Sequence, residues 1–127
     1  GDTIFFIADR GAQAALYAGQ IRTELGTKLD LLEKNAYRFC YINDFPMFEK
    51  DPETKKIGFT HNPFSMPQGG LEALNTKDPL DILAYQYDIV CNGVELSSGA
   101  VRNHDMEIME KAFDIAGYDK ETLKDKY

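Results

Sequence analysis

The sequence lacks the features that mark membrane, secreted and zinc-binding proteins. Its longest apolar run, Ile4–Ala8, is far shorter than the ~20 residues of a membrane-spanning helix, and no basic segment precedes it as in a signal peptide. The two cysteines, Cys40 and Cys91, lie in separate apolar stretches without metal-site spacing, so we expect both to be buried and reduced. These absences favour a soluble, cytoplasmic protein with no membrane partner.

Positive charge is also scarce. The 127 residues include 14 Lys and Arg against 21 Asp and Glu, a formal net charge of −7. This balance argues against a broad basic surface for nucleic acid, so any such contact has to be local. Hydrophobic residues make up 43% of the chain and aromatic residues 12%, which is enough for a folded core and excludes a fully disordered acidic tail.

The first part of the chain has the pattern of a strand followed by a helix. Residues 2–8 are rich in β-branched and aromatic side chains and predict a buried strand. Asp9 is a candidate N-cap, and Gly26 a candidate helix end. Between them, apolar residues recur at helical spacing: Ala14, Ala18, Ile21 and Leu25.

The rest of the chain predicts an antiparallel sheet. We expect Tyr37–Glu49, kinked or ended at Pro46, to pair with Ile57–His61 across an exposed turn. A long loop over 63–79 with a short helix at 71–74 follows. Ile82–Cys91 and Val94–Leu96 flank Asn92-Gly93, a strong hairpin signal.

Two helices close the chain. Met106, Met109, Ala112, Phe113 and Ala116 have helical spacing, which predicts a helix from His104 to a stop at Gly117. A charged helix is expected over 120–126. The order of elements predicts an α+β fold with an antiparallel sheet and flanking helices.

Glu95 and Arg102 are the first candidate site residues. Glu95 lies between apolar neighbours, and a buried carboxylate needs a partner or a cation. Their odd offset sends the two side chains to opposite faces of a regular strand, so we predict a bulge within Ser97–Gly99 that restores a common face. They form either a structural ion pair or two solvent-exposed edge residues, or else a carboxylate for a metal-bound phosphate and a guanidinium for a substrate carboxylate. Spacing alone leaves these alternatives open.

Histidine is the other candidate type. His61 precedes Asn62-Pro63-Phe64 at the mouth of the long loop, where it is either a surface or capping residue or part of a site. His61, His104 and Asp105 have no recognised ligand spacing, so no zinc is predicted.

Several stretches together resemble one family. They are Asp44–Glu49, His61–Phe64, Tyr87–Leu96, Ser98–Arg102 with His104-Asp105, and Gly1–Asp9. These stretches are similar to bacterial aspartyl-tRNA synthetases, which are class II aminoacyl-tRNA synthetases, and the resemblance covers essentially the whole chain. It implies that residues 1–36 are the end of the bacterial insertion domain and that 37–127 are the middle part of the catalytic domain.

The resemblance implies roles for three residues. Glu95 matches a residue that holds ATP and its Mg²⁺, whereas Arg102 and His61 match residues that bind L-aspartate. The implied activity is ATP-dependent formation of aspartyl-adenylate and then aspartyl-tRNA, in protein biosynthesis, by a cytoplasmic homodimer. The tRNA is tRNA-Asp and, for some members, also tRNA-Asn. No catalytic residue is assigned.

The three class-defining motifs of the family are not found in these residues. We therefore expect a central fragment of a larger enzyme that is inactive alone. Two alternatives remain: a related class II ligase acting on asparagine or aspartate without tRNA, and a non-catalytic paralogue or interaction module that kept the scaffold. Arg102 disfavours a neutral amino acid as substrate.

Overall fold

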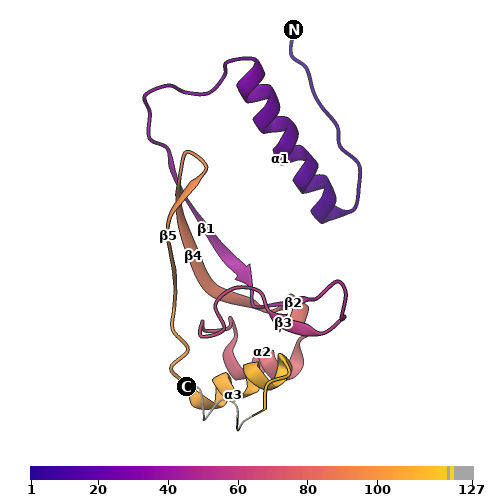
Figure 1. Cartoon of the computed structure of the whole chain (residues 1–127), viewed down its shortest axis with the longest axis vertical. Helices are drawn as coiled ribbons and strands as arrows, with labels where there is room; N and C mark the ends of the chain where they lie inside the picture. Colours follow the sequence, from indigo (N-terminus) through magenta and orange to yellow (C-terminus); the bar gives the residue numbers. More distant parts are fainter. Residues whose placement is uncertain (120, 122–127) are drawn as a thin grey trace. The chain divides into compact units, whose positions relative to one another are not determined.

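The computed structural model describes residues 1–119 and 121, and the chain divides into two compact units, Gly1–Ala36 and Tyr37–Tyr127 (Figure 1). The strands are β1 (Phe39–Pro46), β2 (Phe48–Lys50), β3 (Ile57–Phe59), β4 (Leu83–Cys91) and β5 (Val94–Ala100). The helices are α1 (Gly11–Lys28), α2 (Gly70–Thr76) and α3 (Met106–Ile115), with a 3-10 turn η1 (Pro79–Asp81). The predicted α+β fold with antiparallel strands is confirmed. The helix predicted over 120–126 lies outside the described residues except at Glu121.

The first unit contains α1 and differs from prediction in three ways. Residues 2–8, all of them described, form no strand and are mostly exposed, because this unit holds no second strand to pair with them. The N-cap is Arg10, without a side-chain cap, and Asp9 only accepts a hydrogen bond from the Arg10 N–H. The helix continues through Gly26 to Lys28, and none of its residues is buried. Assignment of this unit to an insertion domain remains a prediction.

The second unit is built on a three-stranded antiparallel sheet in the order β1-β4-β5 and a separate β2-β3 hairpin. The predicted pairing of Tyr37–Glu49 with Ile57–His61 is correct only for β2 and β3. The larger part, β1, pairs with β4 instead. The chain turns between Pro46 and the buried Met47, whose N–H donates to Ile82 O at 2.8 Å, so one predicted strand becomes two.

The turn between β4 and β5 follows the sequence closely. Asn92 and Gly93 both have positive φ, 49° and 80°, as a type I′ hairpin requires. The predicted hairpin is confirmed, and β5 runs further than predicted, to Ala100. This hairpin sets the register that brings β5 across from β4.

A glycine comparison tests this turn. A Cβ at Gly93 meets nothing within 4 Å, so Gly93→Ala costs only its left-handed backbone, about 1–2 kcal/mol of unfolding free energy. Gly58 in β3 has equally open space but no positive φ, so Gly58→Ala stabilises by about 0.4–1 kcal/mol. Urea unfolding of the 127-residue chain measures both changes. Effects of the same sign would contradict this account of the turn.

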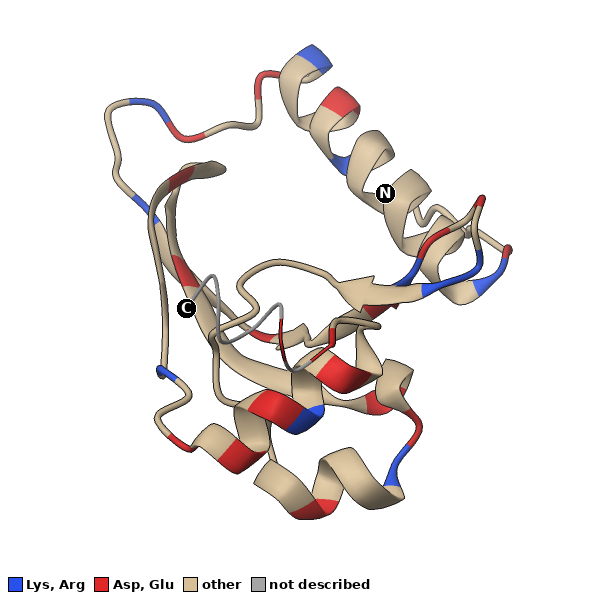
Figure 2. Ribbon diagram, turned by 60° about the horizontal axis from the view of Figure 1, so that its bottom comes forward, with Lys and Arg blue, Asp and Glu red and all other residues tan. Residues whose placement is uncertain are grey.

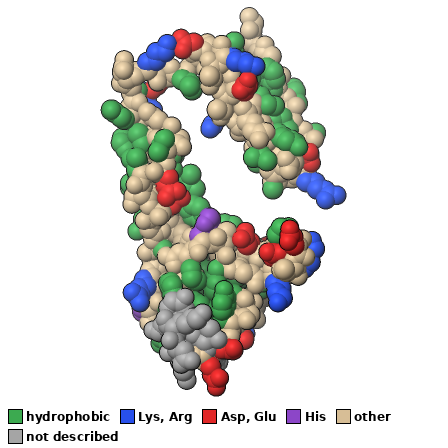
Figure 3. All heavy atoms as spheres, viewed as in Figure 1, with side chains coloured by type: hydrophobic (Ala, Val, Ile, Leu, Met, Phe, Trp, Pro, Cys, Tyr) green, Lys and Arg blue, Asp and Glu red, His purple; other side chains and the backbone are tan. Residues whose placement is uncertain are grey.

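The core lies where β2, β3, α2 and α3 meet the beginning of β4. Its main cluster comprises Met47, Phe48, Leu74, Ile82, Ala84 and Ala112. Phe59 joins it to Phe113, with ring centroids 4.9 Å apart. The outer parts of β1, β4 and β5 extend away from this core (Figure 1), and hydrophobic side chains remain on their surface (Figure 3). Cys91 is buried as predicted, but Cys40 is exposed because it lies on β1, an edge strand.

The helix α3 matches its sequence signals. Asp105 caps it by accepting hydrogen bonds from the N–H groups of Glu107 (2.9 Å) and Ile108 (3.2 Å). Gly117, with φ of 81°, ends it, and Tyr118 N donates back to Phe113 O at 2.9 Å. The predicted helix is confirmed but begins at Met106 rather than His104. Of its predicted apolar face, Met109, Ala112 and Phe113 are buried, whereas Met106 is exposed.

Two further observations concern the described surface. On the β2-β3 turn, the N–H groups of Thr54 (2.6 Å) and Glu53 (2.9 Å) donate to Asp51, and these hydrogen bonds hold the pKa of that carboxyl below its usual range.

Among the described residues, no helix has both the length and the apolar character that crossing a membrane requires.

Candidate active site

One face of the three-stranded sheet forms a pocket of about 280 Å³. We call it the His61 pocket. It is lined by Phe45 of β1, His61 and Asn62 of the loop after β3, Gln86 and Asp88 of β4, and Glu95, Ser98 and Gly99 of β5. The pocket thus joins an imidazole, two carboxylates, two amides and a hydroxyl on four segments of the chain.

An irregularity in β5 gives these residues a common face. Ser97 pairs with Ile89 and Glu95 pairs with Val90, so Leu96 is an extra residue on β5. The predicted bulge exists, but at Leu96, before the Ser97–Gly99 segment, which pairs regularly with β4. The bulge turns Glu95 to the face of Ser98, and both line the His61 pocket.

Arg102 follows the same alternation. Ser98, Ala100 and Arg102 are two residues apart, and the Val101 N–H still bonds to Tyr85 O at 2.9 Å beyond the end of β5. Strand alternation therefore assigns Arg102 to the face of Glu95. Arg102 is nevertheless not among the residues that line the His61 pocket.

Glu95 is not the buried carboxylate predicted from its apolar neighbours. Both Glu95 and Arg102 are exposed: Glu95 lies on β5, an edge strand, and Arg102 lies two residues beyond the end of that strand. Within the described residues, neither side chain forms an ion pair or a hydrogen bond, so the structural ion-pair interpretation is wrong for this chain. Their exposure agrees with the other alternative, two solvent-exposed residues, and it leaves both charges accessible to a ligand.

His61 is held by its neighbours in the loop. Its ring lies edge-on to Phe45, with centroids 5.1 Å apart. The next residue, Asn62, accepts a hydrogen bond from the Phe64 N–H at its side chain, 2.9 Å away, which forms an Asx turn. The exposed imidazole of His61 therefore belongs to a segment of fixed backbone.

Asp88 was missed by the sequence analysis. It pairs with Ser98 across the sheet and lines the His61 pocket together with Glu95. The hairpin signal at Asn92-Gly93 alone could not have found it, because a regular hairpin pairs Asp88 with Ser97 and only the bulge at Leu96 shifts the pairing to Ser98. No cluster of three or more His, Cys, Asp or Glu suited to a metal occurs in the described part of the chain. Two carboxylates do suit Mg²⁺, which usually binds through one or two of them plus substrate phosphates.

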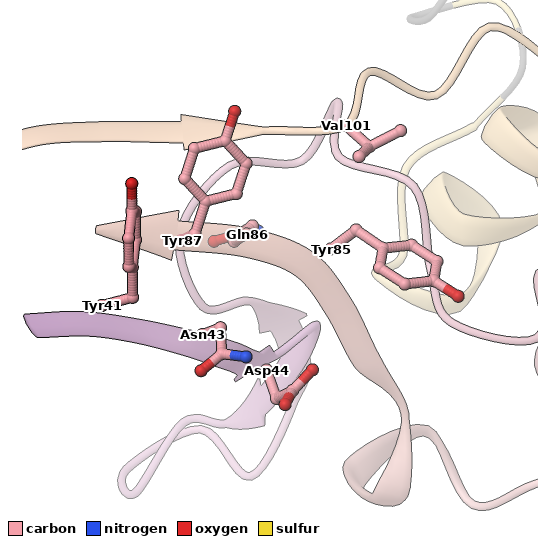
Figure 4. Close-up of a pocket in the computed structure, with 7 residues that line it drawn as sticks. All are labelled: Tyr41, Asn43, Asp44, Tyr85, Gln86, Tyr87 and Val101. Atoms are coloured by element: carbon pink, nitrogen blue, oxygen red, sulfur yellow. The ribbon is translucent and has the colours of Figure 1, made fainter. Parts of the chain in front are cut away.

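The opposite face carries a different pocket, of about 510 Å³, lined mainly by Tyr41, Tyr85 and Tyr87 (Figure 4). The Tyr87 ring lies so close to Gly99 that a Cβ there would be 2.7 Å away, so the glycine admits the ring. This face has Asp44 as its one charged lining residue. It lacks the paired carboxylates of the His61 pocket.

Comparison with known sequences shows which family the chain belongs to. Residues 12–127 match the family model described as tRNA synthetases class II (D, K and N). The chain belongs to these class II tRNA synthetases. The resemblance found in the sequence motifs is thereby confirmed.

Similar full-length synthetases carry consistent names. The chain is 61% identical over all 127 residues to "Aspartate–tRNA(Asp/Asn) ligase" of Gluconobacter oxydans, of which it spans 21%. It is 63% identical over 126 residues, 99% of this chain, to the protein of the same name in Zymomonas mobilis, again 21% of that protein. It is also 59% identical over 127 residues, its full length, to "Aspartate–tRNA ligase" of Streptomyces avermitilis, of which it spans 22%. This class II chain thus covers about a fifth of these relatives.

Proposed function

We propose that the full-length protein containing this chain is an aspartate–tRNA ligase, which activates L-aspartate with ATP and transfers the aspartyl group to tRNA. One observation carries the proposal: in a class II synthetase chain, His61, Asp88 and Glu95 line one pocket on a face that β5 alternation also assigns to Arg102. The names of relatives 59–63% identical support it. The predicted substrate roles of His61 and Arg102 are part of this proposal.

The activation step uses these groups for binding and orientation. The Arg102 guanidinium pairs with the side-chain carboxylate of aspartate through two parallel hydrogen bonds. An oxygen of the aspartate α-carboxylate then bonds to the α-phosphorus of ATP, the bond to the β-phosphate bridging oxygen breaks, and pyrophosphate leaves with that electron pair. In the second step a ribose hydroxyl of tRNA takes the aspartyl group, and AMP leaves.

Selectivity follows from the charge of Arg102. Asparagine has an amide in place of one carboxylate oxygen, so part of the guanidinium fork loses its acceptor when the ligand binds. A site built to pair a charged group rejects an analogue that leaves its donors unpaired. We therefore propose aspartate, and neither asparagine nor lysine, as the amino acid.

Glu95 and Asp88 are the proposed ligands of Mg²⁺ that accompanies ATP. Both are oxygen donors in one pocket, which fits a hard cation. The bound ion supplies positive charge to the phosphate oxygens. Glu95 and Asp88 would hold this ion on the side of the pocket formed by β4 and β5.

The two helices of the second unit that pack on its core do not form a surface for tRNA. Helix α2 carries Glu72, and α3 carries Glu107, Glu110 and Asp114 against one lysine (Figure 2), so these helices do not favour the phosphates of RNA. We propose tRNA-Asp and tRNA-Asn as acceptors of the full-length protein, because relatives such as those of Gluconobacter oxydans and Zymomonas mobilis are named as ligases of both. Aminoacylation of each purified tRNA by the full-length protein tests this proposal. A related ligase that acts without tRNA would attach aspartate to neither tRNA.

Pyrophosphate exchange tests the activity itself. We expect radioactive pyrophosphate to enter ATP with the full-length protein and aspartate, and not with asparagine or lysine. The 127-residue chain alone should show no exchange with any of the three. Exchange with asparagine or lysine in place of aspartate would contradict the proposed substrate, and no exchange in either protein would favour a non-catalytic paralogue.

The resemblance also implies a cytoplasmic homodimer, and we include both features in the proposal. The molecular mass of the full-length protein in solution checks the dimer. Fractionation of cells checks the compartment.

A further inference from the structure

A buried hydrogen-bonded group forms part of the wall of the His61 pocket, which two of its residues line, and none of the roles above uses its hydrogen bonds. It consists of the Asn62 carbonyl, the Ser65 hydroxyl and the Gln86 side chain. Ser65 is fully buried and Gln86 is 6% exposed. Polar side chains at that depth are costly unless every strong hydrogen bond is made.

The geometry of this group is complete at Ser65. Its Oγ donates to Asn62 O at 2.7 Å and accepts a hydrogen bond from Gln86 Nε2, also at 2.7 Å. Gln86 Nε2 additionally donates to Asn62 O at 3.2 Å. Three polar groups thus hold one another, and they tie the backbone beside His61 to strand β4.

Ser65 also connects to Arg102 through the backbone. The two residues form an isolated antiparallel bridge. Hydrogen bonds on either side support it, from Met66 N to Val101 O and from Asn103 N to Phe64 O, both 2.8 Å long. One buried residue therefore contacts the segment of His61, the strand of Asp88 and the backbone of Arg102.

This arrangement matters because the proposed ligand-binding side chains are exposed. Exposed side chains select a small carboxylate ligand only if the backbones that carry them are fixed relative to one another. His61 and Arg102 lie on segments far apart in sequence. In the described structure, Ser65 is the residue that the contacts above join to both of these segments.

We propose that Ser65, together with Gln86, is a positioning residue that fixes the spacing between His61 and Arg102 and so sets the affinity for aspartate. This inference rests on the proposed function. The Ser65 hydroxyl has no proposed contact with ATP, with the Mg²⁺ ligands Glu95 and Asp88, or with the reacting atoms. Loss of the Ser65 hydroxyl is therefore expected to act on aspartate more than on ATP.

Kinetics of the full-length protein test this role by pyrophosphate exchange. Ser65→Ala should raise the KM for aspartate about tenfold, the effect of one lost buried hydrogen bond, with the KM for ATP changed less than about twofold. Gln86→Leu should act in the same direction. Ser65→Thr, which keeps the hydroxyl, should restore the parent value. The double variant Ser65→Ala/Gln86→Leu should raise KM by less than the product of the single effects, because the two groups share one contact.

The matched control is Gln68→Leu. Gln68 also donates a side-chain hydrogen bond, at 2.6 Å to Asp44, but this bond is exposed and Asp44 lines the tyrosine-rich pocket on the other face. The Gln68→Leu substitution should leave the KM for aspartate and the KM for ATP unchanged. Parent-like KM for aspartate in Gln86→Leu and Ser65→Ala, or equal rises for aspartate and ATP, would overturn the positioning role. If Ser65→Ala does not fold, Gln86→Leu and Ser65→Thr decide it alone. A parent that does not exchange with aspartate defeats the proposed function, whereas an active parent with unaffected variants defeats only this inference.

Discussion

Replacement of Arg102 by leucine in the full-length protein is expected to remove most of its recognition of aspartate. The substitution leaves the ligand carboxylate without its charged partner in the closed complex, which costs about 2–5 kcal/mol, or roughly one and a half to three and a half orders of magnitude in kcat/KM. Pyrophosphate exchange at varied aspartate concentration measures this loss. Discrimination between aspartate and asparagine should fall with it, because the charge that separates them is gone.

The control for this variant is Arg22→Leu. Arg22 is an equally exposed arginine of α1, in the other compact unit. Because the Arg102 side chain makes no ion pair or hydrogen bond among the described residues, Arg102→Leu should unfold at nearly the same temperature as the parent. An aspartate kcat/KM within twofold of the parent would remove Arg102 from the proposed site.

Local chemistry decided which parts of the fold were predictable. The type I′ turn at Asn92-Gly93 and the helix stop at Gly117 depend on residues within a few positions of one another, and both are confirmed. The pairing of β1 with β4 joins residues between 37 (Pro46 and Leu83) and 52 (Phe39 and Cys91) positions apart, and no local signal distinguishes it from pairing with β3. Residues 2–8 show the same limit, because residues with strand propensity form a strand only where a neighbouring strand pairs with them.

The site was predictable in composition but not in burial. Glu95 sits between apolar residues in sequence, yet those residues lie on an edge strand, where apolar neighbours do not imply a buried carboxylate. The bulge was expected from the odd offset to Arg102, and its position at Leu96 depended on the β4 register. Asp88 required both the hairpin register and the bulge, which no single motif contains. Ser65 had no signal at all, because its partners come from three segments.

Exposure of Glu95 and Arg102 has a consequence for binding. In the free chain both charges are hydrated, so neither carries the cost of a buried, unpaired charge. The electrostatic contacts become strong only when a ligand displaces that water. The rigid part of the site is therefore the buried backbone around Ser65, and the charged part is left open to the ligand.

Substitution of Glu95 by glutamine is expected to impair ATP use rather than aspartate binding. The amide keeps the size of the side chain but removes the negative charge that the proposed Mg²⁺ site needs. Loss of one such electrostatic contact typically costs about 10²–10³-fold in rate. Pyrophosphate exchange should fall by that factor, and the Mg²⁺ concentration for half-maximal exchange should rise. Asp88→Asn should act in the same direction, because both carboxylates line the His61 pocket.

The matched control is Glu53→Gln. Glu53 is an exposed glutamate on the turn between β2 and β3, and it is not among the residues that line the His61 pocket. It should leave the Mg²⁺ dependence unchanged. Titration with Mg²⁺ at saturating aspartate separates the outcomes. If the Glu95→Gln variant keeps the parent's Mg²⁺ requirement but has a higher KM for aspartate, Glu95 binds the amino acid rather than the nucleotide. Because Arg102→Leu and Glu95→Gln are predicted to act on different substrates, the two variants together show how the open face of the sheet is divided between aspartate and ATP.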